Sequence, residues 1–188
     1  MNETIDVAPV LETARLRLRP YRASDLAVQA AILADPRVTR HLGGTPLSRE
    51  DAWRRMLCGP SLWALLGYGY WAVDRLEDGA MIGFMGFADF KRDMVPSIEG
   101  RPEMGWIFAS EAQGKGYCTE AVRAGLAWAD EKLSGEAVVA IISPDNHPSI
   151  AVAERCGFTG RQDATYRGEP ILLFTRPPQI VASMSAGI

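Results

Sequence analysis

The stretch from residue 102 to residue 144 constrains the fold more than any other part of the chain. It contains a strand pattern, "PEMGWIFA", a helix pattern, "YCTEAVRAGLAWADEKL", and a nearly continuous apolar strand pattern, "EAVVAIISP". Val122, Leu126, Ala129 and Leu133 recur at helical spacing and predict one buried helix face. A strand, a helix and a buried strand in this order form a right-handed crossover between two parallel strands. The sheet is therefore predicted to contain a parallel pair.

The first half of the chain favours antiparallel pairing instead. "YGYWAVDR" and "MIGFMGFADF" flank the turn signal "EDGA", and this arrangement predicts a hairpin. "ARLRLRPY" alternates apolar and basic residues, which predicts a half-buried first strand with Arg15, Arg17 and Arg19 on its solvent face. Helices are predicted for "SDLAVQAAILAD" and "LSREDAWRRML", the second with Ser48 and Asp51 as a capping pair.

The last quarter of the chain adds a helix and a final strand. "NHPSIAVAERCGF" has Pro148 near the predicted helix start and Gly157 just past its end, and "YRGEPILLFTR" predicts a strand. Residues 177–188 carry no pattern and are expected to fray. Because no repeat or linker divides the sequence, we expect residues 1–188 to form one domain. Its predicted class is α/β, with an antiparallel N-terminal half, a parallel pair and helices on both faces.

Composition excludes several classes of protein. Asp and Glu (23) slightly outnumber Lys and Arg (20) without a block of like charge, so nucleic acid is not an expected partner. No apolar run has membrane-spanning length, and the N-terminus lacks the features of a signal peptide. Three dispersed cysteines and two histidines favour a reducing compartment and argue against a metal centre. We expect a cytoplasmic protein, and its oligomeric state stays open, a homodimer included.

A glycine-rich stretch, "AQGKGYCTEA", precedes the long predicted helix. The first turn of a helix offers free N–H groups to an anion, and glycine lets the backbone approach it closely. The nucleoside-triphosphate loop GxxxxGK[ST] does not fit, because Ala109 and Gly116 occupy two of its required positions. A dinucleotide GxGxxG does not fit either, because Thr119 stands at the third glycine. A phosphate site and a simple tight turn are the two alternatives that the stretch leaves open.

Five ordered segments together resemble one known family. Residues 113–118 match Q/R-x-x-G-x-G/A, with Cys118 in place of the usual Gly or Ala. "LETARLRLRPYRASD", "EMGWIFA", "GYCTEA" and "NHPSIAVAERCGF" agree in order and distance. The sequence resembles the GNAT superfamily of acyl-CoA N-acyltransferases over residues 11–176, and within it the RimJ/RimL type of ribosomal-protein N-terminal acetyltransferase.

The resemblance implies a site for acetyl-CoA. In that family the fourth and fifth strands, here 103–109 and 137–143, splay apart and hold the pantetheine arm. Its backbone contacts would fall on Trp106, Ile107 and Phe108, with the Trp106 and Phe108 side chains in the core. Asn146 would contact the cofactor arm, with a simple helix cap as the alternative role, and Ser149 would lie near the thiol. Gln113 would fix the loop, and the pyrophosphate would lie on the backbone amides of Gly114, Lys115, Gly116, Tyr117, Cys118 and Thr119, with the Lys115 side chain toward the 3′-phosphate.

The same resemblance implies direct attack of an amine on the thioester. Glu103 matches the family's glutamate and would act as base, with Glu99 as its substitute and a surface glutamate as the alternative interpretation. The N–H of Phe108 would meet the charge that develops on the thioester oxygen. The family's proton-donating tyrosine is replaced by Ala153, which leaves Ser149 or water as the donor.

A covalent acyl-cysteine is the competing mechanism. Cys156 and Cys118 are the candidate nucleophiles, but neither histidine has the local context of a paired base. Both cysteines are therefore expected to be passive, and no metal is expected to take part.

The predicted function is an acetyl-CoA-dependent N-acetyltransferase acting on a protein N-terminal α-amine. A small-molecule amine such as an antibiotic or a polyamine is the alternative acceptor. A non-catalytic acyl-CoA-binding module is the alternative from a different class. The acceptor site would be shaped by "VTRHLGGTPLSRE" and "KRDMVPSIEGRP", where His41 could touch the acceptor or simply face solvent.

Overall fold

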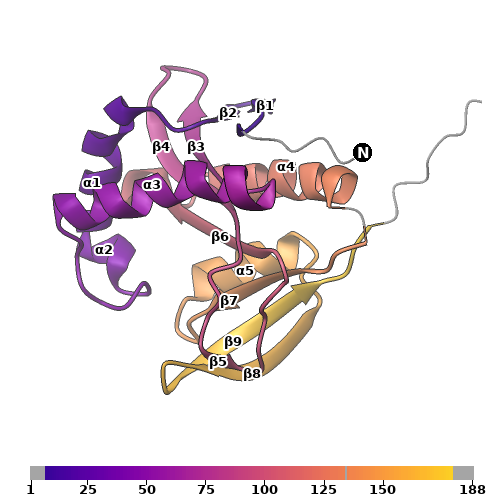
Figure 1. Ribbon diagram of the computed structural model, residues 1–188. Helices are drawn as coiled ribbons and strands as arrows, with labels where there is room; N and C mark the ends of the chain where they lie inside the picture. The colour runs from indigo at the N-terminus through magenta and orange to yellow at the C-terminus, as the bar shows by residue number, and fades with distance from the viewer. Residues whose placement is uncertain (1–6, 134, 180–188) are drawn as a thin grey trace, which may run out of the picture.

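A nine-stranded mixed sheet runs through the molecule (Figure 1). The computed structural model describes residues 7–133 and 135–179. The strands, in chain order, are β1 Leu11–Glu12, β2 Leu16–Arg19, β3 Tyr70–Arg75, β4 Met81–Ala88, β5 Met94–Val95, β6 Glu103–Phe108, β7 Val138–Ile142, β8 Gly160–Tyr166 and β9 Glu169–Arg176, and their spatial order is β1-β2-β3-β4-β6-β7-β9-β8-β5. The α-helices are α1 Leu26–Ala34, α2 Pro36–Thr39, α3 Arg49–Leu66, α4 Tyr117–Lys132 and α5 His147–Arg155, and short 3₁₀ turns cover Ala23–Asp25 and Ser110–Ala112.

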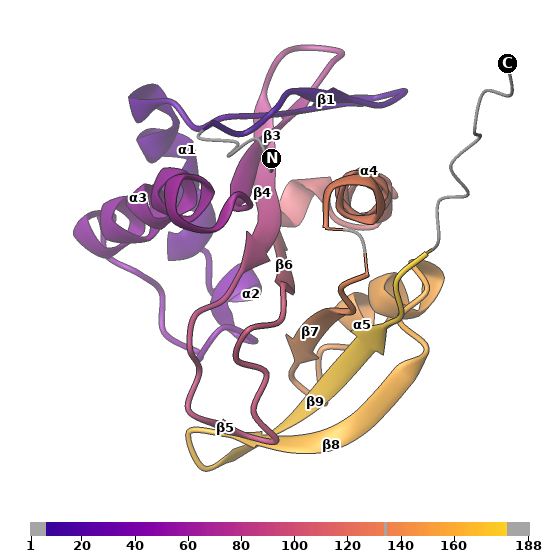
Figure 2. The ribbon, with the colours of Figure 1, turned by 45° about the vertical axis from the view of Figure 1, so that its right-hand side comes forward.

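The predicted crossover is present as β6–α4–β7. Strands β6 and β7 are parallel, whereas every other strand pair of the described chain is antiparallel. A single pair of residues, Glu103 and Val139, joins the two parallel strands, and beyond it they diverge (Figure 2). The mixed sheet thus has an antiparallel half on each side of one splayed junction.

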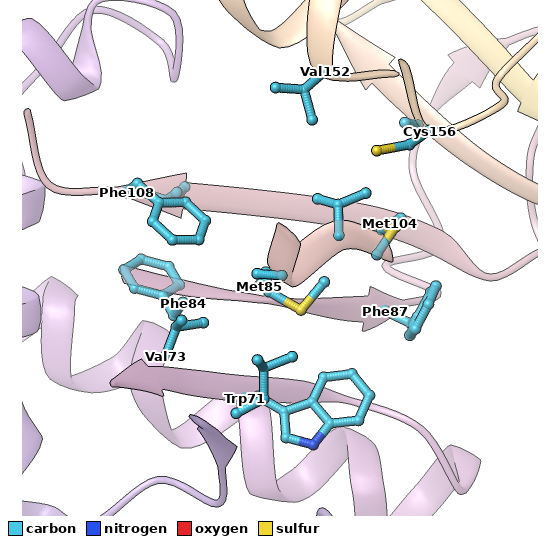
Figure 3. Packing of buried hydrophobic residues seen from close by; sticks show 14 of the residues in the cluster. Trp71, Val73, Phe84, Met85, Phe87, Met104, Phe108, Val152 and Cys156 are labelled. Atoms are coloured by element: carbon cyan, nitrogen blue, oxygen red, sulfur yellow. The ribbon is translucent and has the colours of Figure 1, made fainter. Parts of the chain in front are cut away.

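Helices cover both faces of the N-terminal half of the sheet. In Figure 2, α1 and α3 lie on one side of β3 and β4, and α4 lies on the other. Val122, Leu126 and Ala129 are buried on the predicted face of α4, and Leu133 packs half-buried beside them. Figure 3 shows the core side chains that β3, β4 and β6 contribute, including Trp71, Met85 and Met104. The helical period of residues 117–133 therefore marked the core face correctly.

Two elements of the C-terminal half differ from the sequence prediction. "YRGEPILLFTR" was predicted as one strand, but Arg167 and Gly168 form a turn, and β9 begins only at Glu169. Strand β8 precedes that turn and was not predicted, because its residues are almost all exposed and show no apolar alternation. Ser48 caps α3 as predicted, and Pro148 lies in the first turn of α5. Most of the predicted fraying tail lies outside the described residues.

The solvent-face prediction holds for Arg15 and Arg17 but is wrong for Arg19. Arg19 is only 5% exposed, and its guanidinium donates to both oxygens of Asp25 and of Asp74, at 2.6–2.9 Å. The turn that follows β2 folds back over this end of the strand and brings Asp25 against it. Alternation along the strand identified the correct side of the sheet, but it could not show that a later turn covers that side.

None of the helices in residues 7–133 and 135–179 has both the length and the apolar character needed to cross a lipid bilayer.

Candidate active site

A cavity of about 800 Å³ opens where β6 and β7 separate. Gly105, Trp106 and Ile107 of β6 line it on one side, and residues 140–143 and Ser149 line it on the other. Residues of α3, the segment after α2 and the β8–β9 turn extend its walls. The splayed junction of the sheet is thus continuous with this cavity, which is open to solvent.

The β6 edge that faces this gap carries free backbone groups. In the antiparallel β4–β6 ladder, alternate residues direct both N–H and C=O toward the partner strand. Ala109 N–H donates to Ile82 C=O, so by alternation Ile107 and Gly105 also face β4. Trp106 and Phe108 then present their backbone groups to the gap. This differs from the expectation for Ile107, whose backbone belongs to the β4 ladder.

A chain of hydrogen bonds connects β6 with α5 across the gap. The indole N–H of Trp106 donates to Ser149 Oγ at 3.3 Å, and the Ser149 backbone N–H donates to Asn146 Oδ1 at 3.2 Å. Asn146 is therefore the N-cap of α5, and its amide NH₂ group has no partner among the described residues. Because Ser149 Oγ accepts from the indole, its own O–H is free to donate into the gap. The Phe108 side chain lies in the core as expected, whereas the Trp106 side chain is half-buried and lines the cavity.

Glu103 is buried within a three-residue cluster. It is 5% exposed, and its two carboxylate oxygens accept from Nε and Nη2 of Arg92 at 2.5 and 2.8 Å. Arg92 also donates to the hydroxyl of Tyr166 at 3.0 Å. Burial opposes the charge of Arg92, but the Glu103 carboxylate outweighs it and raises the Arg92 pKa. The alternative of a surface glutamate is therefore wrong. Glu99, the substitute, is exposed, pairs with Lys91 at 3.5 Å and does not line the cavity.

Tyr70 is a cavity residue that the sequence did not identify. Burial, and then the negative charge of Glu103, raise the pKa of Tyr70 to about 12, so its hydroxyl is neutral at physiological pH. A Cβ atom at Gly105 would lie 2.4 Å from the Tyr70 hydroxyl oxygen, which explains why glycine follows Met104 in "EMGW". The tyrosine comes from β3, the strand on the far side of β4, so only the folded sheet places it beside β6.

The glycine-rich loop has the backbone geometry of an anion site. Gly114 and Gly116 have φ of +73° and +80°, and Gly116 begins α4 without a side-chain cap on the helix amides. Arg15 fixes the loop from outside: its Nη1 donates to the Lys115 carbonyl at 3.0 Å, and its guanidinium pairs with Glu120 at 2.6 Å. The loop does not line the main cavity. Gly116 and Thr119 instead line a shallow depression with Arg15, Arg123 and Arg155.

The local contacts of Gln113 and Lys115 agree with their expected peripheral roles. Gln113 Nε2 donates to the Phe108 carbonyl at 3.4 Å, which ties the loop to the end of β6. Lys115 is exposed, and its side chain makes no hydrogen bond or ion pair with a described residue.

The two inner cysteines are unsuited to nucleophilic attack. Burial, with a further contribution from Cys156, raises the pKa of Cys118 well above that of a free thiol. Burial also raises the pKa of Cys156, whose Sγ lies 3.9 Å from the Thr119 carbonyl and, in Figure 3, among the core side chains. A thiol is reactive only as thiolate. Both residues therefore behave as small buried side chains.

His41 lines the main cavity instead of facing solvent. Its Nε2 is buried and has no hydrogen-bond partner in the described chain. Burial, and then the positive charge of Arg40, lower the pKa of His41, so the ring is neutral at physiological pH.

Gly116→Val should weaken acetyl-CoA binding about tenfold or more, equivalent to about 1.4 kcal/mol. A β-branched residue strongly disfavours φ near +80°, and its Cβ would lie 3.3 Å from Arg15 Nη2. Titration calorimetry with acetyl-CoA measures the effect. Gly67→Val is the matched control, because Gly67 has φ +72° at the end of α3 and open space around it. If both variants bind acetyl-CoA equally well, the loop does not hold the pyrophosphate.

The fold agrees with what comparison to known proteins shows. Residues 15–159 match the acetyltransferase (GNAT) domain family. The chain belongs to the GNAT acetyltransferase family. A solved Bordetella pertussis protein assigned to the GnaT acetyltransferase family is 32% identical, with a TM-score of 0.78 over 90% of this chain and 99% of that one. The uncharacterized N-acetyltransferase p20 of Bacillus licheniformis is 28% identical over 79% of this chain and 81% of its own length.

The branch within this GNAT family is less defined than the family itself. RimL, a ribosomal L7/L12 alpha-N-protein acetyltransferase solved with coenzyme A, has a TM-score of 0.71 at 18% identity over 92% of this chain and 99% of its own. The aminoglycoside acetyltransferase AAC(6')-Ib, also solved with coenzyme A, has the same TM-score of 0.71 at 20% identity, over 88% of this chain and 96% of its own. At these identities the likeness concerns the fold alone. The comparisons therefore show a GNAT acetyltransferase, and they do not confirm the expected RimJ/RimL branch.

Proposed function

We propose that this GNAT acetyltransferase transfers the acetyl group of acetyl-CoA directly to a primary amine, at the mouth of the gap between β6 and β7. The unpaired edge of β6 carries this proposal. Pantetheine contains two amides, each with a donor and an acceptor, and an exposed strand edge satisfies such groups as an added strand would. Trp106 and Phe108 offer these backbone groups, and Glu103 lies at the opposite end of the same strand.

The loop before α4 would hold the pyrophosphate. Its glycines leave the amides of residues 114–119 open, and the helix N-terminus favours negative charge. Arg15 keeps the loop in this form from outside, without occupying the amides. In this arrangement Asn146 directs its free NH₂ group toward the cofactor arm.

Each step of the transfer has a candidate residue. Acetyl-CoA supplies an acyl carbon activated as a thioester. Glu103 would accept the proton of the attacking amine, directly or through water, because Arg92 occupies only two of the roughly four acceptor positions of the carboxylate. The resemblance assigns the carbonyl oxygen to the Phe108 N–H, but Phe108 lies about 16 Å along β6 from Glu103. The Trp106 N–H also faces the gap and lies nearer to Glu103, so it would stabilise the charge on that oxygen while the new C–N bond forms. Ser149 would donate a proton to the departing thiolate as the C–S bond breaks, with water as the alternative donor.

We place a protein or peptide N-terminal α-amine first among the acceptors, as in RimL-type enzymes. A small-molecule amine is the second candidate, since the aminoglycoside acetyltransferase AAC(6')-Ib has the same fold. The test is a thiol-release assay with acetyl-CoA against peptides of varied first residue, polyamines, aminoglycosides and free amino acids. Turnover of any amine supports the enzyme. Tight acetyl-CoA binding without turnover of any amine would instead indicate a binding module.

Direct transfer predicts that radiolabelled acetyl-CoA alone leaves no acid-stable label on the protein. Cys156 is buried and Cys118 is partly buried, and desolvation raises the pKa of both thiols, so neither offers a thiolate to the thioester. Intact-protein mass spectrometry after incubation without acceptor measures the outcome. Cys58, which is exposed, serves as an internal control because iodoacetamide should modify it readily. A stoichiometric acetyl group on Cys156 or Cys118 would show a covalent mechanism.

A further inference from the structure

The charged side chains around the main cavity are unbalanced in favour of positive charge. Arg40, Arg55, Arg92 and Arg167 line it together with Glu103 and Glu169, which gives a net charge of +2. The whole chain has a net charge of −3, so this surrounding differs in sign from the protein as a whole. His41 adds no charge, because its ring is neutral.

Three of these arginines have no counter-ion among residues 7–133 and 135–179. Arg92 is neutralised by Glu103, but the side chains of Arg40, Arg55 and Arg167 make no ion pair or hydrogen bond with any residue in the described part of the chain. Outside the cavity both kinds of arginine occur: Arg15, Arg17, Arg37, Arg54 and Arg75 pair with a carboxylate, whereas Arg22, Arg49 and Arg161 make no ion pair with a described residue. The convergence of unpaired arginines on one cavity is therefore the distinguishing feature. We call Arg40, Arg55 and Arg167 the cavity arginines.

The cavity arginines converge from three separate segments. Arg40 caps the end of α2, Arg55 lies within α3, and Arg167 lies in the β8–β9 turn. A charged helix face would place its residues on one element, so this convergence requires the tertiary fold. Arg167 also has φ +54°, a conformation that glycine, asparagine and aspartate adopt more readily than arginine. The turn thus holds an arginine where local backbone preference favours another residue.

We infer that the amine acceptor carries carboxylate groups close to the amine that is acetylated. This inference rests on the proposed function and names its acceptor class. Guanidinium groups bind carboxylates through paired, charge-assisted hydrogen bonds, and an uncompensated positive rim attracts anions and repels polycations. An acidic peptide N-terminus and a free acidic amino acid share this chemistry. Polyamines and aminoglycosides have the opposite charge.

The first arm of the test compares acceptors that differ only in charge. Three peptides of equal length begin with alanine, followed by two Asp, two Asn or two Lys residues. Free aspartate is assayed beside them as a small-molecule acceptor. We expect kcat/KM for the Asp peptide to exceed that for the Asn peptide about tenfold, and that for the Lys peptide by more. The advantage should shrink as salt rises from low to 0.5 M, because exposed charges are screened. Free aspartate as the better substrate would identify an amino acid as the source of the carboxylate.

The second arm removes one cavity arginine. Arg55→Gln should lower the Asp-to-Asn preference about fivefold, mainly through KM, without changing acetyl-CoA affinity. Arg49→Gln is the matched control, because Arg49 lies on the same helix, also makes no ion pair with a described residue, and does not line the cavity. Arg167→Gln provides a second, independent variant in the β8–β9 turn.

Each unfavourable outcome has a distinct meaning. Equal or better turnover of the Lys peptide would overturn the carboxylate inference and leave the acetyltransferase proposal intact. A loss of acetyl-CoA affinity in Arg55→Gln would show that the cavity arginines serve the cofactor phosphates, which also overturns it. Binding of acetyl-CoA with no turnover of any amine would overturn both the inference and the proposed function.

Discussion

Arg19→Met should lower the free energy of unfolding by about 3–5 kcal/mol, the usual cost of removing one partner from a buried ion pair. Arg19 is the shared counter-ion of Asp25 and Asp74, and all three residues are buried. Methionine fills a similar volume but leaves two carboxylates in the interior without a counter-charge. Urea denaturation followed by circular dichroism measures the change, with the slope of the transition as a check on two-state behaviour.

Arg17→Met is the matched control for this effect. Arg17 lies two residues away on the same strand and pairs with Glu12, but both side chains are about half exposed. The change in unfolding free energy should stay within about 0.5 kcal/mol, because exposed ion pairs contribute little. Comparable losses in the two variants would mean that the buried cluster contributes no more than a surface pair.

The Arg19 effect should also depend on pH. Burial opposes the charge of Asp25, but hydrogen bonds from Arg19 and the Arg22 backbone outweigh it and lower the Asp25 pKa below its usual value. A lowered pKa contributes stability that is present above the unfolded value near 4 and is lost as pH falls through the folded value. In Arg19→Met the buried Asp25 carboxyl lacks this cation, so burial raises its pKa above the usual value. The difference between wild type and variant should therefore be full at pH 7 and begin to shrink above pH 4, as Asp25 of the variant takes up a proton.

Arg19 illustrates what the sequence could and could not predict of the fold. Local periodicity identified the first strand, the hairpin and the face of α4, because each of these buries a regular apolar set. It did not identify β8, whose residues are mostly exposed on both faces and which is held by its pairing with β9. It also could not show that the turn at Ala23–Asp25 returns over β2, because that cover depends on tertiary packing.

The candidate site also contains residues that could be predicted from the sequence and residues that could not. The cavity brings together residues that the family resemblance placed on β6 and at the start of α5: Glu103, Trp106, Ile107, Asn146 and Ser149. Phe108 does not line it. Arg92, Tyr166 and Tyr70 were missed, because no spacing in the sequence relates them to Glu103. The Arg92–Tyr166 contact spans 74 positions, and Tyr70 reaches β6 only across β4. Neither the motif nor the composition contains that information.

Glu103→Gln should lower kcat about 10²-fold, within the range for loss of a general base. Glutamine keeps the size of the side chain but cannot accept the amine proton, directly or through water. The affinity for acetyl-CoA should hardly change, because the backbone of Trp106 and Phe108 and the loop before α4 are untouched. Steady-state kinetics with the best acceptor from the thiol-release assay, together with calorimetry, measure both quantities.

Disruption of the cluster is the competing explanation for such a loss. Glutamine also breaks the paired hydrogen bonds to Arg92, which connect the segment after β4 to β6. Arg92→Gln breaks the same pair while keeping the carboxylate, and Tyr166→Phe removes only the outer hydroxyl. If Glu103 is the base, both variants should keep much more activity than Glu103→Gln. Equal losses in Glu103→Gln and Arg92→Gln would assign Glu103 a structural role.

The dependence of activity on pH is a second way to distinguish a role of Glu103 as general base from a purely structural role. The amine must be neutral to attack, and raising the pH makes a larger fraction of it neutral without a base. The ratio of Glu103→Gln activity to wild-type activity should therefore rise between about pH 7 and pH 9. A loss caused only by a disrupted cluster should leave that ratio unchanged, because the neutral fraction of the amine is the same for both enzymes. Glu99→Gln is the control for a nearby carboxylate, because Glu99 is exposed and does not line the cavity. We expect Glu99→Gln to keep the wild-type rate and pH profile. Full activity of Glu103→Gln near neutral pH would instead show that Glu103 is not the base, and it would leave water as the proton acceptor.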